Sequence, residues 1–256
     1  MSDFTSNEMM TIAASRMLGK SDVCFVGIGI PSAAANLARL THAPELVLIY
    51  ESGTIGTKPD VLPLSIGDGE LSETADVVVS VPEMFRYWLQ GGHIDVGFLG
   101  AAQIDKFANI NTTVIGDYSA PKVRLPGAGG APEISTQCKE VLIVLKQSKR
   151  SFLDKISFIT SPGHITGGTS RKDAGISTKG PKAVITDLCV MEPDPLSKEL
   201  TVVSLHSGVT KQDVIENTGW EIKFAADIKE TSVPTPTELK ELRQLNDRTN
   251  KAHGVA

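Results

Sequence analysis

Hydrophobic residues near the start of the chain form short runs that alternate with helical patterns. Residues 23–30 (VCFVGIGI) predict a strand that enters a glycine turn, and residues 46–50 (LVLIY) predict a strand buried on both faces. Between these runs, residues 32–40 (SAAANLARL) predict a helix that ends before Pro44, with Ser32 as its expected N-cap. The order strand, helix, strand is the unit from which parallel sheets are built.

The same alternation continues to residue 100. Residues 76–81 form another apolar run typical of a buried strand, and Ser80 with Glu83 forms a capping box that predicts a helix start. The predicted helix places three apolar side chains on one face, namely Phe85, Trp88 and Leu89. Two consecutive glycines end this helix, and residues 95–100 return to strand. The pattern therefore predicts an α/β protein with a mainly parallel open sheet and helices on both faces, a three-layer α/β/α arrangement.

The second half of the chain is richer in strand patterns. The predicted strands are residues 112–115, 140–145, 156–160, 183–189 and 200–205. A helix is predicted to begin at residues 210–213, and a last helix begins at a capping box formed by Thr235 and Glu238, with Pro236 in its first turn. Leucines continue this helix at helical spacing, at positions 239, 242 and 245.

A single domain over residues 1–256 accounts for this organisation. A chain of 256 residues can bury roughly 70% of its extended surface, which is ample for a core. Glycine-rich loops at residues 127–130 and 163–168 interrupt the pattern, and we interpret them as functional loops rather than as linkers. We interpret the histidines as surface or loop residues, and His164, which lies in the second of these loops, is the one histidine of interest as a site residue.

Composition and charge exclude several classes of protein. Hydrophobic residues make up 41% and charged residues 21%, as in folded globular domains. The formal net charge of −5 gives no reason to expect nucleic acid or an anionic membrane as a partner. Neither the three cysteines nor the five histidines have the spacing of zinc ligands or of a disulfide framework, so we expect no metal and a reducing cytoplasm. The first twenty residues carry acidic side chains before any apolar run, unlike a signal peptide, and no run approaches the ~18 apolar residues of a membrane span.

The first candidate site is the glycine turn at Gly27 and Gly29. A glycine turn between a strand and a helix exposes backbone N–H groups that favour anionic ligands. One interpretation is a dinucleotide-binding site, with Glu51 as the ribose ligand about twenty residues further on. Ser32 stands where that motif requires a third glycine, which counts against this interpretation.

Glu51, Ser52 and Gly53 form the second candidate, directly after the buried run at 46–50. Ligand sites in open α/β sheets lie at the carboxyl ends of the strands. A glutamate is ionised at neutral pH, so it can attack an activated carbonyl without a general base. The alternative is a strand-end carboxylate that faces solvent.

The third candidate is the loop that contains Gly127, Gly129 and Gly130. Glycines at this density allow the positive φ angles from which an anion-binding nest of backbone N–H groups is built. A nest directed at a carbonyl oxygen acts as an oxyanion hole. The alternative is a flexible surface loop.

Together these motifs resemble the β subunits of the family I coenzyme A transferases. The resemblance covers residues 7–252 and is carried by the order and spacing of six segments. These are GIGIP (27–31), ESG (51–53), LGAAQID (99–105), NINTTVIGDY (109–118), PGAGGAPEI (126–134) and ITDLCVMEP (185–193).

The resemblance implies that Glu51 attacks the acyl-CoA thioester and that the loop at 127–131 supplies oxyanion contacts. It also places Gln103, Ser52 and the glycines at 27, 29 and 53 among the substrate contacts. CoA and succinyl-CoA would be substrates, no resident cofactor would be needed, and the chain would work with an α subunit in a hetero-oligomer. The implied reaction transfers CoA from succinyl-CoA to 3-oxoadipate in the β-ketoadipate pathway.

Other functions stay open at this stage. Serine at position 52 is similar to the glutaconate branch, so glutaconate or another dicarboxylate is an alternative acceptor. An acyl-CoA hydrolase on the same scaffold is a second alternative. A domain that binds a dinucleotide or a sugar phosphate without catalysis is a third, and it would turn over no acyl-CoA.

Overall fold

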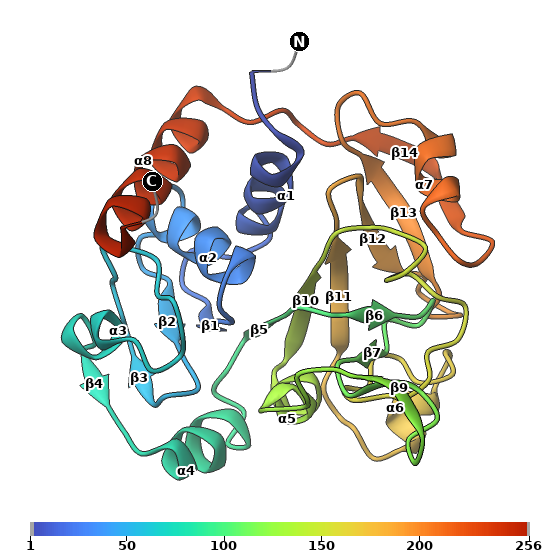
Figure 1. The fold of residues 1–256 in the computed structure, drawn as a ribbon, viewed down its shortest axis with the longest axis horizontal. Helices are drawn as coiled ribbons and strands as arrows, with labels where there is room; N and C mark the ends of the chain where they lie inside the picture. The colour runs from blue at the N-terminus through green and yellow to red at the C-terminus, as the bar shows by residue number, and fades with distance from the viewer. Residues whose placement is uncertain (1–2, 255–256) are drawn as a thin grey trace. The chain divides into compact units, whose positions relative to one another are not determined.

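The computed structural model describes residues 3–254, and its contacts divide the chain into two compact units (Figure 1). The terminal unit holds residues 3–98 and 233–254, and the central unit holds residues 99–232. The single domain expected over residues 1–256 stays a prediction. Within residues 3–254, no helix is both long and apolar enough to cross a bilayer.

The terminal unit is built from helices and a five-stranded portion of sheet in the order β5-β1-β2-β3-β4. Its helices are α1 (Ser6–Ser15), α2 (Ile30–Leu40), α3 (Gly69–Glu73), α4 (Val81–Glu83), the π-helix η1 (Met84–Leu89) and α8 (Pro236–His253). Its strands are β1 (Val23–Phe25), β2 (Val47–Ile49), β3 (Thr54–Ile55), β4 (Val77–Val78) and β5 (Val96–Leu99), the last residue of β5 belonging to the central unit. β1 pairs in parallel with both β2 and β5, which confirms the strand, helix, strand unit predicted from the sequence.

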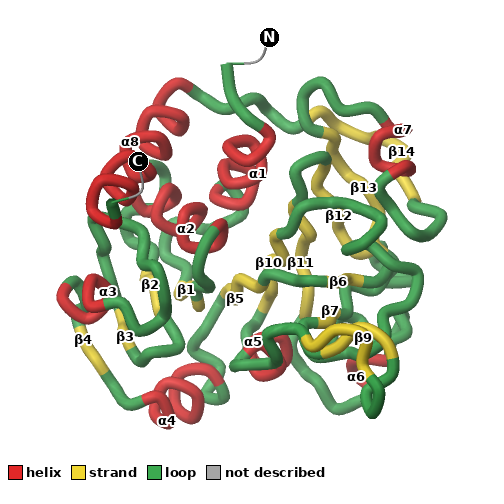
Figure 2. The backbone as a smooth tube through the Cα atoms, viewed as in Figure 1, coloured by secondary structure: helices red, strands yellow, loops and turns green. Residues whose placement is uncertain are grey.

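The central unit has more strands than the terminal unit, and its helices are all shorter than α1, α2 and α8 (Figure 2). Its strands are β6 (Gln103–Ile104), β7 (Ile110–Asn111), β8 (Val114–Gly116), β9 (Pro121–Arg124), β10 (Glu140–Val144), β11 (Gly180–Ile185), β12 (Cys189–Pro193), β13 (Leu200–Leu205) and β14 (Lys223–Glu230). Its helices are α5 (Ala131–Gln137), α6 (Ser170–Asp173) and α7 (Lys211–Glu216). β14-β13-β12-β11-β10 form one portion of sheet, with parallel pairs at β10–β11 and β13–β14 and antiparallel pairs between β11, β12 and β13.

Helices from both ends of the chain share one hydrophobic cluster in the terminal unit. Ile12 of α1, Leu37 of α2 and Leu242 of α8 are all buried in it. The predicted start of α8 is confirmed, because Thr235 accepts from the Glu238 N–H and the Glu238 carboxylate accepts from Thr235 in return. The C-terminal helix therefore completes the core around α1 and α2 rather than forming a solvated extension.

Two predictions about the terminal unit were wrong. Gly29 is the N-cap of α2, and Ser32 lies inside the helix, where its hydroxyl bonds the Tyr50 hydroxyl at 2.9 Å. The run at 76–81 forms the short edge strand β4, whose Val77 and Val78 are both more than half exposed. An edge strand pairs on one side alone, so its apolar composition does not imply burial on both faces.

Two strand predictions in the central unit were also wrong. Residues 156–160 form no strand; Thr160 instead uses its side chain to accept from the Thr112 N–H at 2.9 Å. The run at 183–189 contains a turn between β11 and β12, where the Thr186 hydroxyl accepts from the N–H groups of Leu188 and Cys189. Threonine side chains that bond nearby backbone end a strand pattern that hydrophobicity alone would continue.

Candidate functional site

Glu51 lies at the tip of a tight hairpin turn between β2 and β3. The Gly53 N–H donates to the Tyr50 carbonyl at 3.0 Å, and the Tyr50 N–H donates to the Thr54 carbonyl at 3.1 Å. Gly53 has φ +98°, the geometry of a turn closed by a glycine bulge. The half-buried Glu51 side chain is therefore carried by a backbone of fixed conformation at the carboxyl end of β2.

Gly53 cannot be replaced at this turn without a shift of the backbone. A Cβ atom at this position would lie 1.9 Å from the Val79 carbonyl oxygen. The two segments are also joined by a hydrogen bond of 2.9 Å from the Val79 N–H to the Gly53 carbonyl. The residues around β4 thus support the turn that carries Glu51.

The glycine turn at Gly27 and Gly29 lies beside the Glu51 turn. β1 and β2 run in parallel with Phe25 opposite Ile49, so the segments that follow them leave the same edge of the sheet. Gly29 has φ +82° and ψ −130°, a region reserved for glycine, whereas Gly27 has no such constraint. The structure therefore brings together Gly27, Gly29, Glu51, Ser52 and Gly53 in the terminal unit.

Tyr50 ties these two turns together, and sequence reasoning missed it. Its ring is fully buried, and its hydroxyl meets the buried Ser32 hydroxyl of α2 at 2.9 Å. Burial raises the pKa of Tyr50 to about 12, although the hydrogen bond with Ser32 opposes this rise. A tyrosine at the end of the apolar run at 46–50 was the signal available in the sequence, because buried tyrosines retain a hydrogen-bond partner.

Gln103 and the glycine loop lie in the central unit. Gln103 in β6 is buried and accepts a 2.8 Å hydrogen bond from the Asn111 amide. The loop follows β9, and its Gly127 N–H donates to the carbonyl of Thr112, the neighbour of Asn111, at 2.8 Å. These contacts place Gln103 and the start of the loop around one segment, residues 111–112.

The geometry of the loop narrows the set of oxyanion donors. Gly127 and Gly129 have φ +111° and +50°, whereas Gly130 has φ −83° and is the N-cap of α5. The succession of left-handed Gly129 and right-handed Gly130 is the backbone pattern of an anion-binding nest. The Gly127 N–H is already bonded to Thr112, so it is not an oxyanion donor while that bond holds.

His164 has a structural role in its loop. Its side chain is 3% exposed, and its Nε2 lies 3.1 Å from the Pro181 carbonyl oxygen. Burial lowers the pKa of His164, and the positive charges of Arg171 and Lys198 lower it further. His164 is therefore neutral in the folded chain at pH 7.

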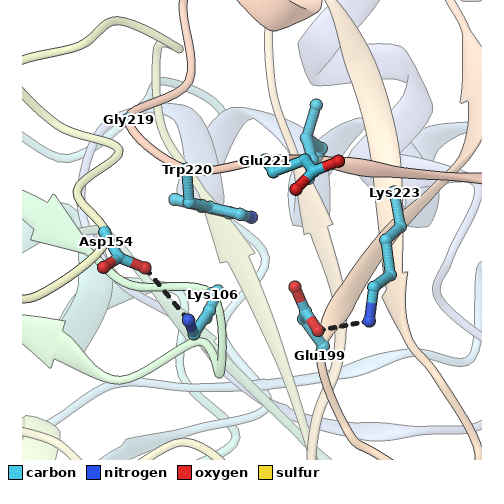
Figure 3. Close-up of a pocket in the computed structure, with 8 residues that line it drawn as sticks. Lys106, Asp154, Glu199, Gly219, Trp220, Glu221 and Lys223 are labelled. Carbon is cyan, nitrogen blue, oxygen red and sulfur yellow. Dashed lines mark hydrogen bonds and ion pairs between the residues drawn. The ribbon is translucent and has the colours of Figure 1, made fainter.

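A cavity of about 530 Å³ in the central unit contains none of the predicted site residues. Figure 3 shows its two ion pairs, Lys106 with Asp154 at 3.0 Å and Lys223 with Glu199 at 2.5 Å. Trp220 lies between them, with its ring stacked on Phe152. Because both lysines are paired with carboxylates, this cavity offers no unmatched positive charge to a ligand.

The chain belongs to the coenzyme A transferase family, since the sequence model described as Coenzyme A transferase matches residues 7–217. It is 68% identical over 254 residues to a 3-oxoadipate CoA-transferase subunit of Pseudomonas knackmussii, covering 99% of this chain and 98% of that protein. It is similar to the crystal structure of glutaconate coenzyme A-transferase from Acidaminococcus fermentans, with a TM-score of 0.88, 31% identity and 94% of each chain covered. It is 27% identical over 225 residues to the cholesterol ring-cleaving hydrolase IpdB subunit of Rhodococcus jostii, covering 85% of this chain and 82% of that protein. The family and the three-layer α/β/α fold expected from the motifs are confirmed.

Proposed function

We propose that this chain is the β subunit of a cytoplasmic CoA-transferase that moves CoA from succinyl-CoA to 3-oxoadipate in the β-ketoadipate pathway. The observation that carries the proposal is the 68% identity, over nearly the full length of both chains, to a protein named for 3-oxoadipate CoA transfer. The similar subunit of glutaconate CoA-transferase is 31% identical, so a C5 dicarboxylate such as glutaconate is the acceptor to test against 3-oxoadipate.

The proposed chemistry uses one carboxylate twice. Glu51 attacks the succinyl-CoA carbonyl and expels CoA thiolate, which leaves a mixed anhydride between succinate and Glu51. The thiolate then attacks the glutamyl carbonyl, releases succinate and forms a glutamyl-CoA thioester. The 3-oxoadipate carboxylate repeats these steps in reverse order and leaves as 3-oxoadipyl-CoA, regenerating Glu51. Each step exchanges one acyl bond for another, so the proposal needs no metal or organic cofactor.

The tight turn suits Glu51 to this role. The bonds on either side of it, from Gly53 to Tyr50 and from Tyr50 to Thr54, fix the backbone from which the carboxylate extends. A nucleophile held in one orientation avoids the entropy loss that a mobile carboxylate would incur in the transition state. The loop in the central unit is proposed separately as an oxyanion-binding nest, from the left-handed conformation of Gly129 followed by right-handed Gly130.

An α subunit is part of the proposal, because the 68% identical relative is named as one subunit of its enzyme. We expect the purified chain alone to have little transferase activity and the chain mixed with its α subunit to be active. The most direct assay follows CoA exchange between succinyl-CoA and 3-oxoadipate for each preparation. Equal rates with and without the α subunit would overturn this part of the proposal.

Glu51→Gln tests the covalent step. Glu45→Gln is a matched control, since Glu45 is an exposed carboxylate near the opposite end of the same strand, β2. The paired enzyme incubated with succinyl-CoA and no acceptor should carry a CoA adduct on Glu51, located by borohydride reduction and peptide mass spectrometry. Glu51→Gln should lose both the adduct and the transfer, whereas Glu45→Gln should keep both. Transfer by Glu51→Gln at the wild-type rate would refute the role of Glu51.

An acyl-CoA hydrolase on the same scaffold is the alternative to test in the same experiment. A hydrolase releases CoA thiol from an acyl-CoA when no acceptor acid is present, and a thiol reagent detects it. A transferase protects its thioester from water, so release should stay slow until 3-oxoadipate is added.

A further inference from the structure

A second cavity in the central unit differs from the first in its charge. It has a volume of about 340 Å³ and lies between the loop at 163–168, helix α6 and the segment at 176–179. Four of its ten lining residues are cationic, namely Arg171, Lys172, Lys179 and Lys198, and none is a carboxylate. This concentration of positive charge occurs in a chain whose formal net charge is −5.

Arg171 is a buried cation at the wall of this cavity. It is 5% exposed, and all of its hydrogen bonds in the structure go to neutral oxygens, among them the Gly163 carbonyl at 2.8 Å and the Ser135 carbonyl at 2.6 Å. Burial lowers the pKa of its guanidinium to about 10, which leaves it charged at pH 7. A buried charge without an opposite charge is costly, so an anion in the cavity would lower the energy of Arg171.

The hydrogen-bond donors to an anion would come from the lysine ammonium groups, because the Arg171 guanidinium already donates to protein oxygens. Lys179 pairs with Glu140 at 2.7 Å, but within residues 3–254 neither Lys172 nor Lys198 forms an ion pair. Lys198 also has φ +63°, a strained conformation for a residue with a side chain. Such strain persists where the surrounding structure holds a residue in place, as at ligand sites.

We infer that this cavity binds a phosphate or pyrophosphate group, held by Lys172 and Lys198 in the field of Arg171. Several clustered positive charges favour a multiply charged anion over a single carboxylate, and lysine binds phosphate as a point charge. Anion binding at this site requires neither Glu51 nor turnover, so it can be measured independently of the proposed reaction. The phosphates can belong to the CoA substrate or to a separate phosphorylated ligand.

Calorimetric titration of the full-length chain with inorganic pyrophosphate tests the site. Each lysine contributes one charge-assisted hydrogen bond, so Lys172→Ala and Lys198→Ala should each raise Kd about 10-fold and the double variant about 100-fold. Lys149→Ala, which removes an exposed lysine elsewhere in the central unit, should leave Kd within about 2-fold of wild type. Thermal unfolding of each variant verifies that it is folded.

A second arm identifies the source of the phosphate. If CoA occupies the site, CoA should compete with pyrophosphate, and the double variant should bind CoA more weakly by a similar factor. If the ligand is a separate phosphorylated molecule, CoA should bind all variants equally while pyrophosphate binding is lost. The inference is overturned if wild type does not bind pyrophosphate at about 10 mM, or if the double variant binds it as wild type does.

Discussion

Gly53→Ala should damage both the stability of the terminal unit and the placement of Glu51. The new Cβ atom would lie 1.9 Å from the Val79 carbonyl oxygen, whereas real Cβ atoms essentially never approach a heavy atom within 3.0 Å. The turn and the 79–80 segment must therefore separate by at least about 1 Å. That movement breaks or lengthens the 2.9 Å hydrogen bond from the Val79 N–H to the Gly53 carbonyl.

These contacts set the loss in the free energy of unfolding that Gly53→Ala should cause. Loss of the Val79 hydrogen bond costs about 1 kcal/mol, and alanine at φ +98° adds about 1–2 kcal/mol of backbone strain. We expect a loss of about 2–4 kcal/mol in the free energy of unfolding, with the residual clash included. A movement of Glu51 by about 1 Å would also reduce transferase kcat by about 100-fold.

Gly92→Ala is a control variant that introduces the backbone strain of a positive φ without a steric clash. Gly92 has φ +78° in the same unit, but no atom lies within 4 Å of the position of its Cβ. This control should lose about 1 kcal/mol and keep its activity. Urea unfolding gives the stabilities, and the CoA exchange assay with the α subunit gives kcat.

Two results would refute the reasoning about Gly53. Equal losses of stability in Gly53→Ala and Gly92→Ala would show that the contact with Val79 has no cost of its own. A folded Gly53→Ala enzyme with wild-type kcat would show that the turn does not position the nucleophile.

Three further predictions concern polar side chains that are buried or half-buried. Tyr50→Phe should lower stability by about 1–2 kcal/mol in urea unfolding, because the buried Ser32 hydroxyl loses its partner; an unchanged midpoint would contradict this. Burial lowers the pKa of His206, so the unfolded chain binds a proton at this histidine more readily than the folded chain as pH falls below 6.5. The free energy of unfolding should therefore decline from pH 7 to pH 5, and His206→Asn should show a weaker dependence on pH. Burial alone would raise the pKa of Glu238, but hydrogen bonds from Arg16 and Thr235 lower it to about 2. The stability that ionised Glu238 contributes above pH 4.5 should therefore disappear between pH 4.5 and 2. Arg16→Ala should remove most of this pH dependence from acid unfolding curves.

Local patterns in the sequence determined the parts of this protein that depend on neighbouring residues. The capping boxes at Ser80 and Thr235, the apolar run at 46–50 and the glycines around Glu51 each act within a few residues, so the sequence alone is enough to recognise them. The order and spacing of the motifs identified the family. A further capping box, Thr5 with Glu8 at the start of α1, was equally recognisable and was missed.

The tertiary structure alone decided which groups lie inside and what they contact. Nothing local to Val77 and Val78 reveals that their strand lies at an edge, where two valines stay exposed. The contact of Tyr50 with Ser32 joins the residue that follows β2 to helix α2. The buried Arg171 is surrounded by carbonyls from three separate segments. Burial, pKa and the accumulation of charge in a cavity depend on residues that are distant in sequence and close in space, and hydrophobic periodicity carries no information about such pairs.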